Sequence, residues 1–329
     1  MAIKILRKYG KEELAYLYIA ENPENGNIVE FVESVQPPIP REKKWVLIIS
    51  TLYGCPIGCK MCDAGTYFRG KLNYNTIISQ IDYLIKHRYP DGNVQSEKFK
   101  IQFARIGEPA LNPNVLKVLK EMPERYEAPG IIPCISTVAP NSANPFFEKL
   151  LAIKDKYYPN GHFQIQFSVH STDQLMRSSI ISENIWTLEE IAEYGEKWYK
   201  KGDRKITLNF AVSEESIIEP AEIRNIFNPR KYFIKLTPVN PTYQAVKNQI
   251  KSGVPEEQED NYELAEQFKA LGYETLLSIG EREENQIGTN CGQFATDFQD
   301  SQVSIKKPLL SKSYTLEKYS SSIQNSKEF

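Results

Sequence analysis

Residues 45–62, WVLIISTLYGCPIGCKMC, place an apolar strand directly before three closely spaced cysteines. The run Trp45–Ser50 is rich in branched apolar residues, which is typical of a buried strand. Cys55, Cys59 and Cys62 follow at intervals of four and three residues. Three thiolates at this spacing can surround one face of an iron–sulfur cubane and leave its fourth iron open to a bound molecule. The stretch therefore predicts a [4Fe–4S] site in the loop that follows a strand.

Structural zinc is the main alternative for these cysteines. A zinc site usually completes its four ligands with a second Cys or His pair. His87, His162 and His170 are isolated along the chain and form no such pair. A set of buried thiols without any ligand is a further alternative. The spacing of the cysteines favours an iron–sulfur cluster over both.

From Trp45 onward, apolar runs typical of strands alternate with amphipathic runs typical of helices. The expected strands are Trp45–Ser50, Phe99–Ala104, Ile131–Ser136, Phe163–Val169, Ile206–Val212 and Tyr232–Thr237. The expected helices between them are Tyr74–Lys86, Asn114–Lys120, Pro145–Ile153, Leu188–Lys200 and Pro220–Phe227. Such alternation predicts parallel strands with right-handed crossovers. The six units predict an α/β fold, a partial (β/α)6 barrel whose function gathers in the loops after the strands.

Short segments flank this alternating region. Two strand-like runs, Leu14–Ala20 and Ile28–Val35, enclose Asn25-Gly26, which is typical of a hairpin turn. A polar stretch rich in Ser and Lys begins near Val303. We therefore expect an N-terminal β-hairpin extension over residues 1–44, a barrel domain over 45–302 and a loosely held tail over 303–329.

The composition limits the function classes. The net charge of −2 argues against a globally basic protein that coats nucleic acid, although it leaves a local basic face open. No apolar run approaches the roughly 20 residues that span a bilayer, and the start of the chain lacks the apolar core of a secretory signal. Five cysteines, three of them in one loop, make a poor disulfide framework. We expect a cytoplasmic protein without membrane contact.

Further motifs follow in the order of a known enzyme family. The cysteine loop after the first barrel strand resembles that of the radical S-adenosylmethionine (SAM) superfamily. Within that superfamily, the rest of the chain resembles the RlmN/Cfr class of RNA methyltransferases. The similar segments are CDAG at 62–65 and FRGKL at 68–72, IGEPALN at 106–112 (class GMGEPLLN), IST at 135–137 (class Ser-Thr), FSVH at 167–170 (class Ser-Leu-His), TPVNP at 237–241 (class Pro-Phe-Asn-Pro) and NCGQF at 290–294 (class Ala-Cys-Gly-Gln-Leu). Together they lie within residues 14–296.

The resemblance implies two cofactors, a [4Fe–4S] cluster and SAM, together with an electron donor such as flavodoxin or ferredoxin. It assigns SAM contacts to Gly107, Glu108, Ser136, Ser168, His170 and Asn240. The residue types suit this role, because glycine permits close approach to a ligand and a carboxylate accepts from the ammonium of methionine. Without the resemblance, an ordinary turn, strand-end capping and a structural histidine are the alternatives.

The same resemblance implies that Cys291 is methylated as an intermediate in methyl transfer. One SAM molecule methylates this cysteine, and a second SAM supplies the radical that abstracts hydrogen from the S-methyl group. The resulting carbon radical then adds to an adenine carbon. The thiolate is the nucleophile in such a transfer. The alternative is a buried, inert thiol.

The chain departs from the class at two places in the site. The class has a second catalytic cysteine seven residues before the first cluster cysteine, where this chain has Ile48. Cys134 is a candidate substitute, although its apolar surroundings indicate a core residue. The class also has a general-base carboxylate in the early hairpin, and two residues match it: Glu30 by hairpin register and Glu33 by the Glu-Ser-Val string. Residues three apart in a strand face opposite sides, so at most one faces the site.

Three functional hypotheses follow. The leading one is a radical SAM enzyme that methylates an unactivated carbon through Cys291. The second is a radical SAM enzyme that abstracts hydrogen directly from a small molecule or peptide. The third is a non-catalytic iron–sulfur or zinc protein that acts as a sensor or interaction module. The class's RNA-binding accessory domain would precede the hairpin, and we expect it to be missing here, so the substrate alternatives are RNA, a small molecule and a peptide.

Overall fold

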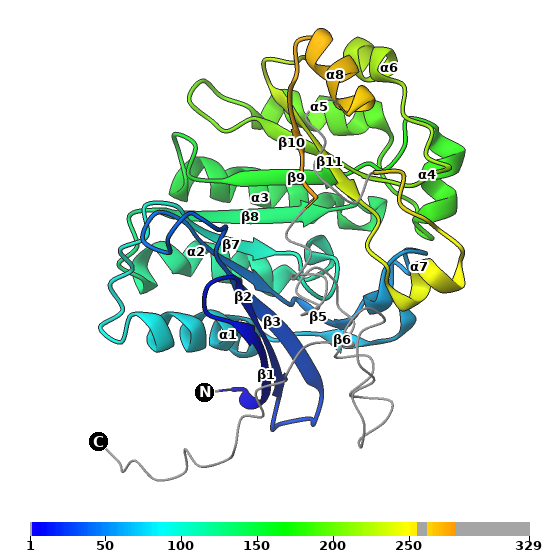
Figure 1. Ribbon diagram of the computed structural model, residues 1–329. Coiled ribbons are helices and arrows are strands. Elements are labelled where there is room, and N and C mark those ends of the chain that lie inside the picture. The colour runs from blue at the N-terminus through cyan, green and yellow to red at the C-terminus, as the bar shows by residue number, and fades with distance from the viewer. Residues whose placement is uncertain (1, 255–261, 280–329) are drawn as a thin grey trace, which may run out of the picture.

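The computed structural model describes residues 2–254 and 262–279, which are built around one ten-stranded sheet (Figure 1). The strands, in their order across the sheet, are β1 (Lys4–Lys11), β2 (Ala15–Glu21), β3 (Ile28–Ser34), β4 (Trp45–Ile49), β7 (Phe99–Phe103), β8 (Ile131–Thr137), β9 (Gln164–Ser168), β10 (Ile206–Val212), β11 (Tyr232–Pro238) and β12 (Glu274–Leu277). The expected tail over 303–329 and Cys291 lie outside the described residues.

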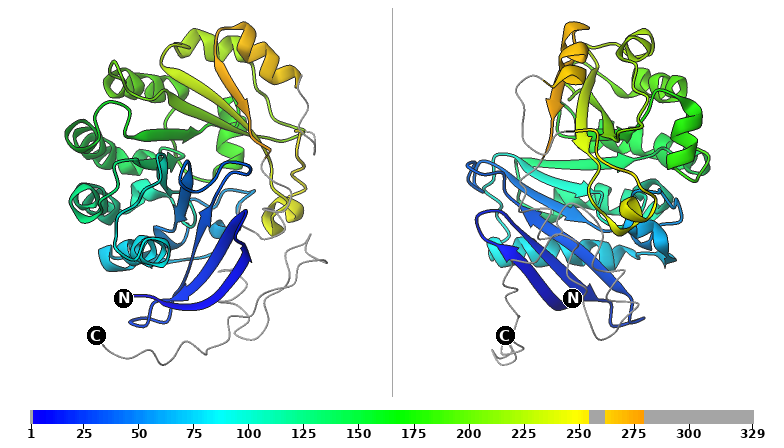
Figure 2. Two further views of the ribbon diagram at one scale, coloured as in Figure 1. Left: turned by 60° about the vertical axis from the view of Figure 1, so that its left-hand side comes forward. Right: turned by 45° about the vertical axis from the view of Figure 1, so that its right-hand side comes forward.

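The strands from β4 to β12 run parallel to one another. Each crossover advances the chain by one strand in the same direction, so right-handed crossovers place the connecting helices on one face. Figure 2 shows these helices as an outer layer along the sheet. In chain order, the helices of the described residues are α1 (Tyr74–Arg88), α2 (Pro113–Arg125), α3 (Asn144–Tyr157), α4 (Gln174–Ile180), α5 (Leu188–Trp198), α6 (Pro220–Ile226), α7 (Tyr243–Lys247) and α8 (Glu263–Ala270). Of these, α7 lies apart from the layer, beside β5 (Leu52–Gly54) and β6 (Phe68–Lys71) (Figure 1). The predicted α/β class is confirmed.

The two faces of the parallel strands differ in chemistry. Alternate side chains of a strand point to opposite faces, and the face toward the helices is apolar, as with Ile101, Phe167 and Leu208. The opposite face, called the inner face below, carries many polar residues: Lys100, Gln102, Ser136, Gln164, Gln166, Ser168, Thr207 and Asn209. A parallel sheet buried under helices on both faces is apolar on both. The polar inner face is therefore the side on which a ligand site is expected.

The N-terminal strands continue the main sheet. The expected hairpin forms as β2 and β3, and β1 pairs with β2 as a further antiparallel strand. Sequence analysis does not predict β1, because its sequence KILRKYGK is strongly charged; charge of this kind suits an exposed edge strand. β3 pairs antiparallel with β4, so the sheet is continuous across the boundary expected at residue 44.

A separate two-stranded sheet frames the cysteine loop. It consists of β5 (Leu52–Gly54) and β6 (Phe68–Lys71), with the 3-10 turn η1 (Asp63–Thr66) between them. Two other 3-10 turns, η2 (Pro109–Leu111) and η3 (Asn141–Ala143), follow β7 and β8. Within the described ranges, no helix is long and apolar enough to cross a membrane.

Candidate functional site

The cysteine loop begins where β5 closes onto the segment before β6. Gly54 ends β5 with a φ of 80°, in the left-handed region. A Cβ atom on Gly54 would collide with the carbonyl group of Tyr67. That carbonyl accepts a hydrogen bond from the Cys55 amide at 2.9 Å. Only glycine fits this turn without strain, and the turn sets where the first cysteine emerges.

Cys55, Cys59 and Cys62 are partly buried and close enough for their charges to interact. Burial raises the pKa of Cys55 to about 12, and the charge of Cys62 adds to the effect. Burial and the two neighbouring thiols likewise raise the pKa of Cys59 well above its usual value. Burial also raises the pKa of Cys62. Ligation of a cluster by these thiols therefore displaces their protons, as metal binding by cysteine generally does.

The donor set of the loop fits an iron–sulfur cluster. A cubane offers a separate iron to each thiolate, so its ligands need not converge on one point as the ligands of a single ion do. Within residues 2–254 and 262–279, no group of three or more His, Cys, Asp or Glu side chains is arranged to hold a metal ion. Three thiols in one short loop are nevertheless the ligands that a [4Fe–4S] cluster with one open iron requires.

The segment after β11 fastens one side of the cysteine loop. The Asp63 carboxylate accepts hydrogen bonds from the backbone amides of Tyr243, at 3.2 Å, and Gln244, at 2.9 Å. The Thr242 hydroxyl donates to the Met61 carbonyl at 2.9 Å. Figure 1 shows α7 beside the small sheet of β5 and β6. These contacts bring the Asn240 segment to the cysteine loop across about 180 residues of sequence.

The segment around α4, which follows β9, fastens another side of the same loop. The Lys60 amide donates to the carbonyl of Ile180 at 2.9 Å. The Ser182 hydroxyl donates to the carbonyl of Gly58 at 3.2 Å. Cys59 packs against the apolar cluster that contains Ile180. The loop is thus held by residues that follow two different strands of the main sheet.

Glu108 lies beside the cysteine loop, at the end of the turn after β7. Gly107 precedes it with a φ of 100°, and a Cβ atom there would collide with the Leu52 side chain. The buried Glu108 carboxylate accepts from the Thr137 hydroxyl at 2.6 Å, and from the amides of Val138 and Ala110 at 3.0 Å each. Burial raises the pKa of Glu108, and these hydrogen bonds act against the rise. A carboxylate has about four acceptor positions, so one position remains for an ammonium donor.

Three other predicted contact residues lie at the carboxyl ends of β8 and β9. Ser136 and Ser168 point to the inner face and are partly exposed. His170 is buried, has a φ of 65°, and its Nδ1 accepts from the Ala211 amide at 3.1 Å. Burial and the nearby Arg177 lower the pKa of His170 to about 4. A neutral imidazole at this edge of the sheet keeps Nε2–H as a donor.

The two candidate bases, Glu30 and Glu33, lie on opposite faces of β3. Residues 28 and 32, on the Glu30 side, pack into the apolar cluster that also contacts Cys55 and Cys62. Residues 29 and 31, on the Glu33 side, pack into the core under the helices. Of the two carboxylates, Glu30 is therefore on the side of the cysteine loop. It is fully buried, and its Oε1 lies 2.5 Å from Nε of Arg105.

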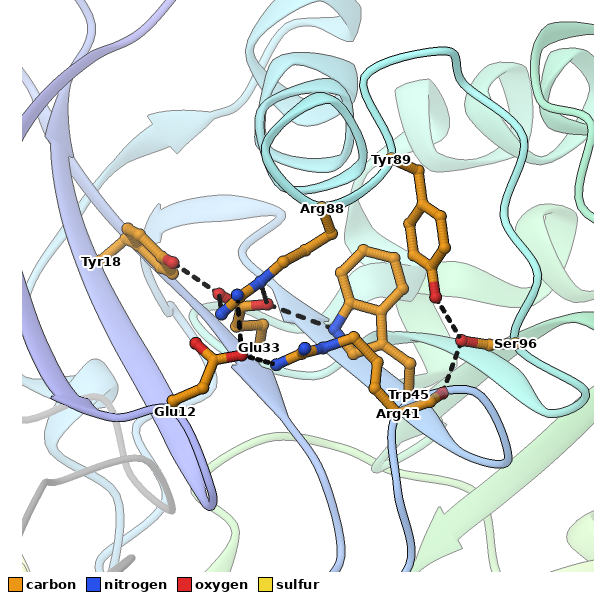
Figure 3. A network of polar contacts seen from close by, with 8 residues as sticks. All are labelled: Glu12, Tyr18, Glu33, Arg41, Trp45, Arg88, Tyr89 and Ser96. Atoms are coloured by element: carbon orange, nitrogen blue, oxygen red, sulfur yellow. Dashed lines mark hydrogen bonds and ion pairs between the residues drawn. The ribbon is translucent and has the colours of Figure 1, made fainter.

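Glu33 belongs to a polar network between β3 and α1 (Figure 3). Its carboxylate accepts from Nε and Nη2 of Arg88, at 2.8 Å each, and from the Tyr18 hydroxyl at 2.6 Å. The indole Nε1 of Trp45 donates to it at 3.3 Å. Arg88 also binds Glu12, at 2.8 Å. Each oxygen of Glu33 is thus engaged by neighbours on the helix side of the sheet.

The residues at the positions of the missing cysteine and its candidate substitute differ in their surroundings. Ile48 pairs with Val32 of β3 and packs against the apolar cluster beside the cysteine loop. Cys134 is buried in the middle of β8, with its sulfur 3.9 Å from Oε1 of Gln164. Burial raises the pKa of the Cys134 thiol. A thiol of this kind is poorly nucleophilic.

Arg105 and Asp63 both contact the site but were not predicted from the sequence. Asp63 was quoted only as part of the CDAG segment, and its partners in α7 are far away in the sequence. Arg105 precedes the IGEPALN segment, at the place of the first glycine in the class motif GMGEPLLN. A substitution of arginine for glycine in a quoted motif was the available signal.

The chain is similar to curated RNA methyltransferases, whereas no family model matches it. "Probable dual-specificity RNA methyltransferase RlmN" of Thermus thermophilus is 26% identical over 268 residues, which cover 78% of this chain and 69% of the relative. The protein of the same name from Desulfitobacterium hafniense is 26% identical over 280 residues (82% and 73%). That from Thermotoga neapolitana is 26% identical over 279 residues (82% and 73%). These relatives confirm the resemblance to the RlmN/Cfr class and, with it, the prediction of an enzyme.

Proposed function

We propose that this chain is a radical SAM enzyme that methylates an unactivated carbon through Cys291. The observation that carries the proposal is the meeting of three thiols with a buried, hydrogen-bonded carboxylate, Glu108, at one edge of a parallel sheet. A sensor or interaction module has no need for this second polar group. The names of the relatives support methyl transfer.

In this proposal, different residues of the chain hold the cluster and bind SAM. Cys55, Cys59 and Cys62 would hold the cluster, and the parallel strands, as a partial (β/α)6 barrel, would turn their polar inner face toward the substrate. Glu108 accepts from the SAM ammonium in the position that its three donors leave open. The other SAM contacts are Gly107, Ser136, Ser168, His170 and Asn240. When bound, the cluster supplies the electron that cleaves SAM to a 5′-deoxyadenosyl radical.

One observation favours a second candidate function, hydrogen abstraction directly from substrate. The class's second catalytic cysteine has no counterpart at Ile48, which packs into an apolar cluster. Cys134, the nearest substitute by type, is buried in mid-strand. A methyl transfer that forms a covalent adduct would need another way to release its product. Cys291 in this candidate serves as a hydrogen donor or ligand.

The names of the relatives support RNA as the substrate class and indicate nothing more specific. A small molecule or a peptide is the alternative. The partner would be an electron donor such as flavodoxin or ferredoxin, because the cluster would have to receive electrons one at a time. We place the reaction in the cytoplasm, where thiols stay reduced.

The experiment that tests methyl transfer reads Cys291 directly. Reduced, reconstituted protein is incubated with SAM, and the Cys291 peptide is examined by mass spectrometry alongside an assay for 5′-deoxyadenosine. We expect a methyl group on Cys291, and Cys291→Ala should abolish methyl transfer. Cys134→Ala is the matched control and should retain methylation of Cys291. Abundant 5′-deoxyadenosine with unmodified Cys291 would replace the first function with the second.

A further inference from the structure

A buried Glu–Arg pair joins β3 to the turn after β7. Glu30 and Arg105 are 0% and 2% exposed, with Oε1 and Nε 2.5 Å apart. The Ser50 hydroxyl donates to the Glu30 carbonyl at 2.5 Å and accepts from the Ile106 amide at 3.2 Å. Backbone and side chains together therefore hold β3 against the turn that leads into Glu108.

The pair lies beside the cysteine loop. Cys62 packs against the apolar cluster to which Val32 and Ile106 belong. Val32 is the next residue on the Glu30 face of β3, and Ile106 follows Arg105 in the chain. Glu30, the partner of Arg105, is on this same face of β3, so the guanidinium lies on the side of the cysteine loop. A fixed cation therefore lies on the face of β3 whose apolar residues contact Cys62, one of the three candidate cluster ligands.

Arg105 also marks a difference from the class. It occupies the place of the first glycine in GMGEPLLN, so the class motif itself supplies no cation there. A buried arginine without an anion is costly. In this chain Glu30 supplies the anion.

We propose that the Arg105 cation makes the bound cluster easier to reduce, and that Glu30 is a positioning residue that fixes the guanidinium on the side of the cysteine loop while offsetting part of its charge. The inference rests on the proposed function, because it requires a cluster on the loop. Reduction adds one negative charge, and a nearby cation in a poorly solvated site stabilises that charge. Net charge around a cluster is one of the quantities that set its reduction potential.

The test is the reduction potential of the anaerobically reconstituted protein, followed by EPR during titration with dithionite and mediators. Arg105→Gln should move the potential to more negative values, and Glu30→Gln should move it to more positive values. The double variant removes both charges, and its potential should lie between those of Arg105→Gln and the wild type, because Glu30 offsets only part of the effect of Arg105. Arg105→Lys keeps the cation and should also stay close to the wild type. A merely structural pair would not shift the potential in opposite directions.

A charge on the opposite face of β3 provides the matched control. Arg88→Gln removes a cation from the Glu33 network and should leave the potential unchanged. If Arg105→Gln does not fold, the comparison of Glu30→Gln with the double variant replaces it, and the potential should become more negative on adding Arg105→Gln. Equal potentials in all cluster-bearing variants would overturn the inference alone. A wild-type protein that binds no iron would overturn the proposed function as well, so the two failures are distinct.

Discussion

Two buried glutamates of β3 are bound by arginines in opposite ways. Glu33, on the helix side, receives Tyr18, Trp45 and Arg88 and links the N-terminal strands to α1. Glu30, on the inner side, meets Arg105 next to the cysteine loop. The residue types are the same, but only the inner pair lies where its charges act on a candidate cluster ligand. We therefore expect substitutions on the helix side of the sheet to change mainly stability, and substitutions on the inner side to change mainly cluster binding and chemistry.

The largest effect is expected on the inner side, from the cysteines themselves. Cys59→Ala removes one of three thiolates and should reduce bound iron and 5′-deoxyadenosine formation to background, because a cubane needs all its protein ligands. Its unfolding by urea should change little. The measurements are iron content after anaerobic reconstitution and product formation. Full iron binding by Cys59→Ala would show that Cys59 is not a cluster ligand.

The outer pair should show the reverse pattern. Arg88→Gln leaves the 2% exposed carboxylate of Glu33 without its cation, and the loss of one partner of a buried pair costs about 3–5 kcal/mol. The free energy of unfolding, from denaturant titration, should fall by that amount, while the folded protein still binds iron. A loss below about 1 kcal/mol, the size of an exposed ion pair, would contradict the role of this network.

A pH experiment tests whether the site edge also contributes stability. Burial lowers the pKa of His170 from 6.5 to about 4, so this residue takes up a proton on unfolding. The free energy of unfolding is therefore highest, as far as His170 is concerned, above pH 6.5. It falls by about 3 kcal/mol as the pH decreases from 6.5 through 4. His170→Asn should flatten the dependence of unfolding free energy on pH in this window, since asparagine tolerates the positive φ. An unchanged slope would show that His170 is not buried as a neutral imidazole.

The smallest effect concerns one donor of the outer network. Tyr18→Phe removes the hydroxyl that donates to Glu33 at 2.6 Å, and a hydrogen bond to a charged group contributes about 1.5–3 kcal/mol. Because Arg88 and Trp45 still donate to Glu33, we expect the lower end of this range in the unfolding free energy. Iron content should match the wild type. A loss of iron in Tyr18→Phe would show that the two faces of β3 are not separable.

Local patterns sufficed to predict the parallel strands and the cysteine loop, but not α4, α7 or the small sheet of β5 and β6, which hold that loop. The strands of the parallel sheet follow from apolar runs, and the spacing of Cys55, Cys59 and Cys62 indicates the cluster loop without any knowledge of its neighbours. Which of Glu30 and Glu33 faces the cysteine loop was not predictable. The answer depends on which face of β3 packs against the helices and which packs beside the loop. The contact of Asp63 with α7 joins segments about 180 residues apart, which no local pattern reports.

We propose that Cys55, Cys59 and Cys62 would hold a [4Fe–4S] cluster and that Glu108 would help to bind SAM to it. EPR spectra of the reduced, anaerobically reconstituted protein with and without SAM test it most directly, together with a count of bound metal. We predict about four irons per chain, as a cubane requires, and a spectrum that SAM alters. Glu108→Gln should weaken that alteration without loss of iron. Bound zinc without iron, or a cluster whose spectrum ignores SAM, would contradict the account.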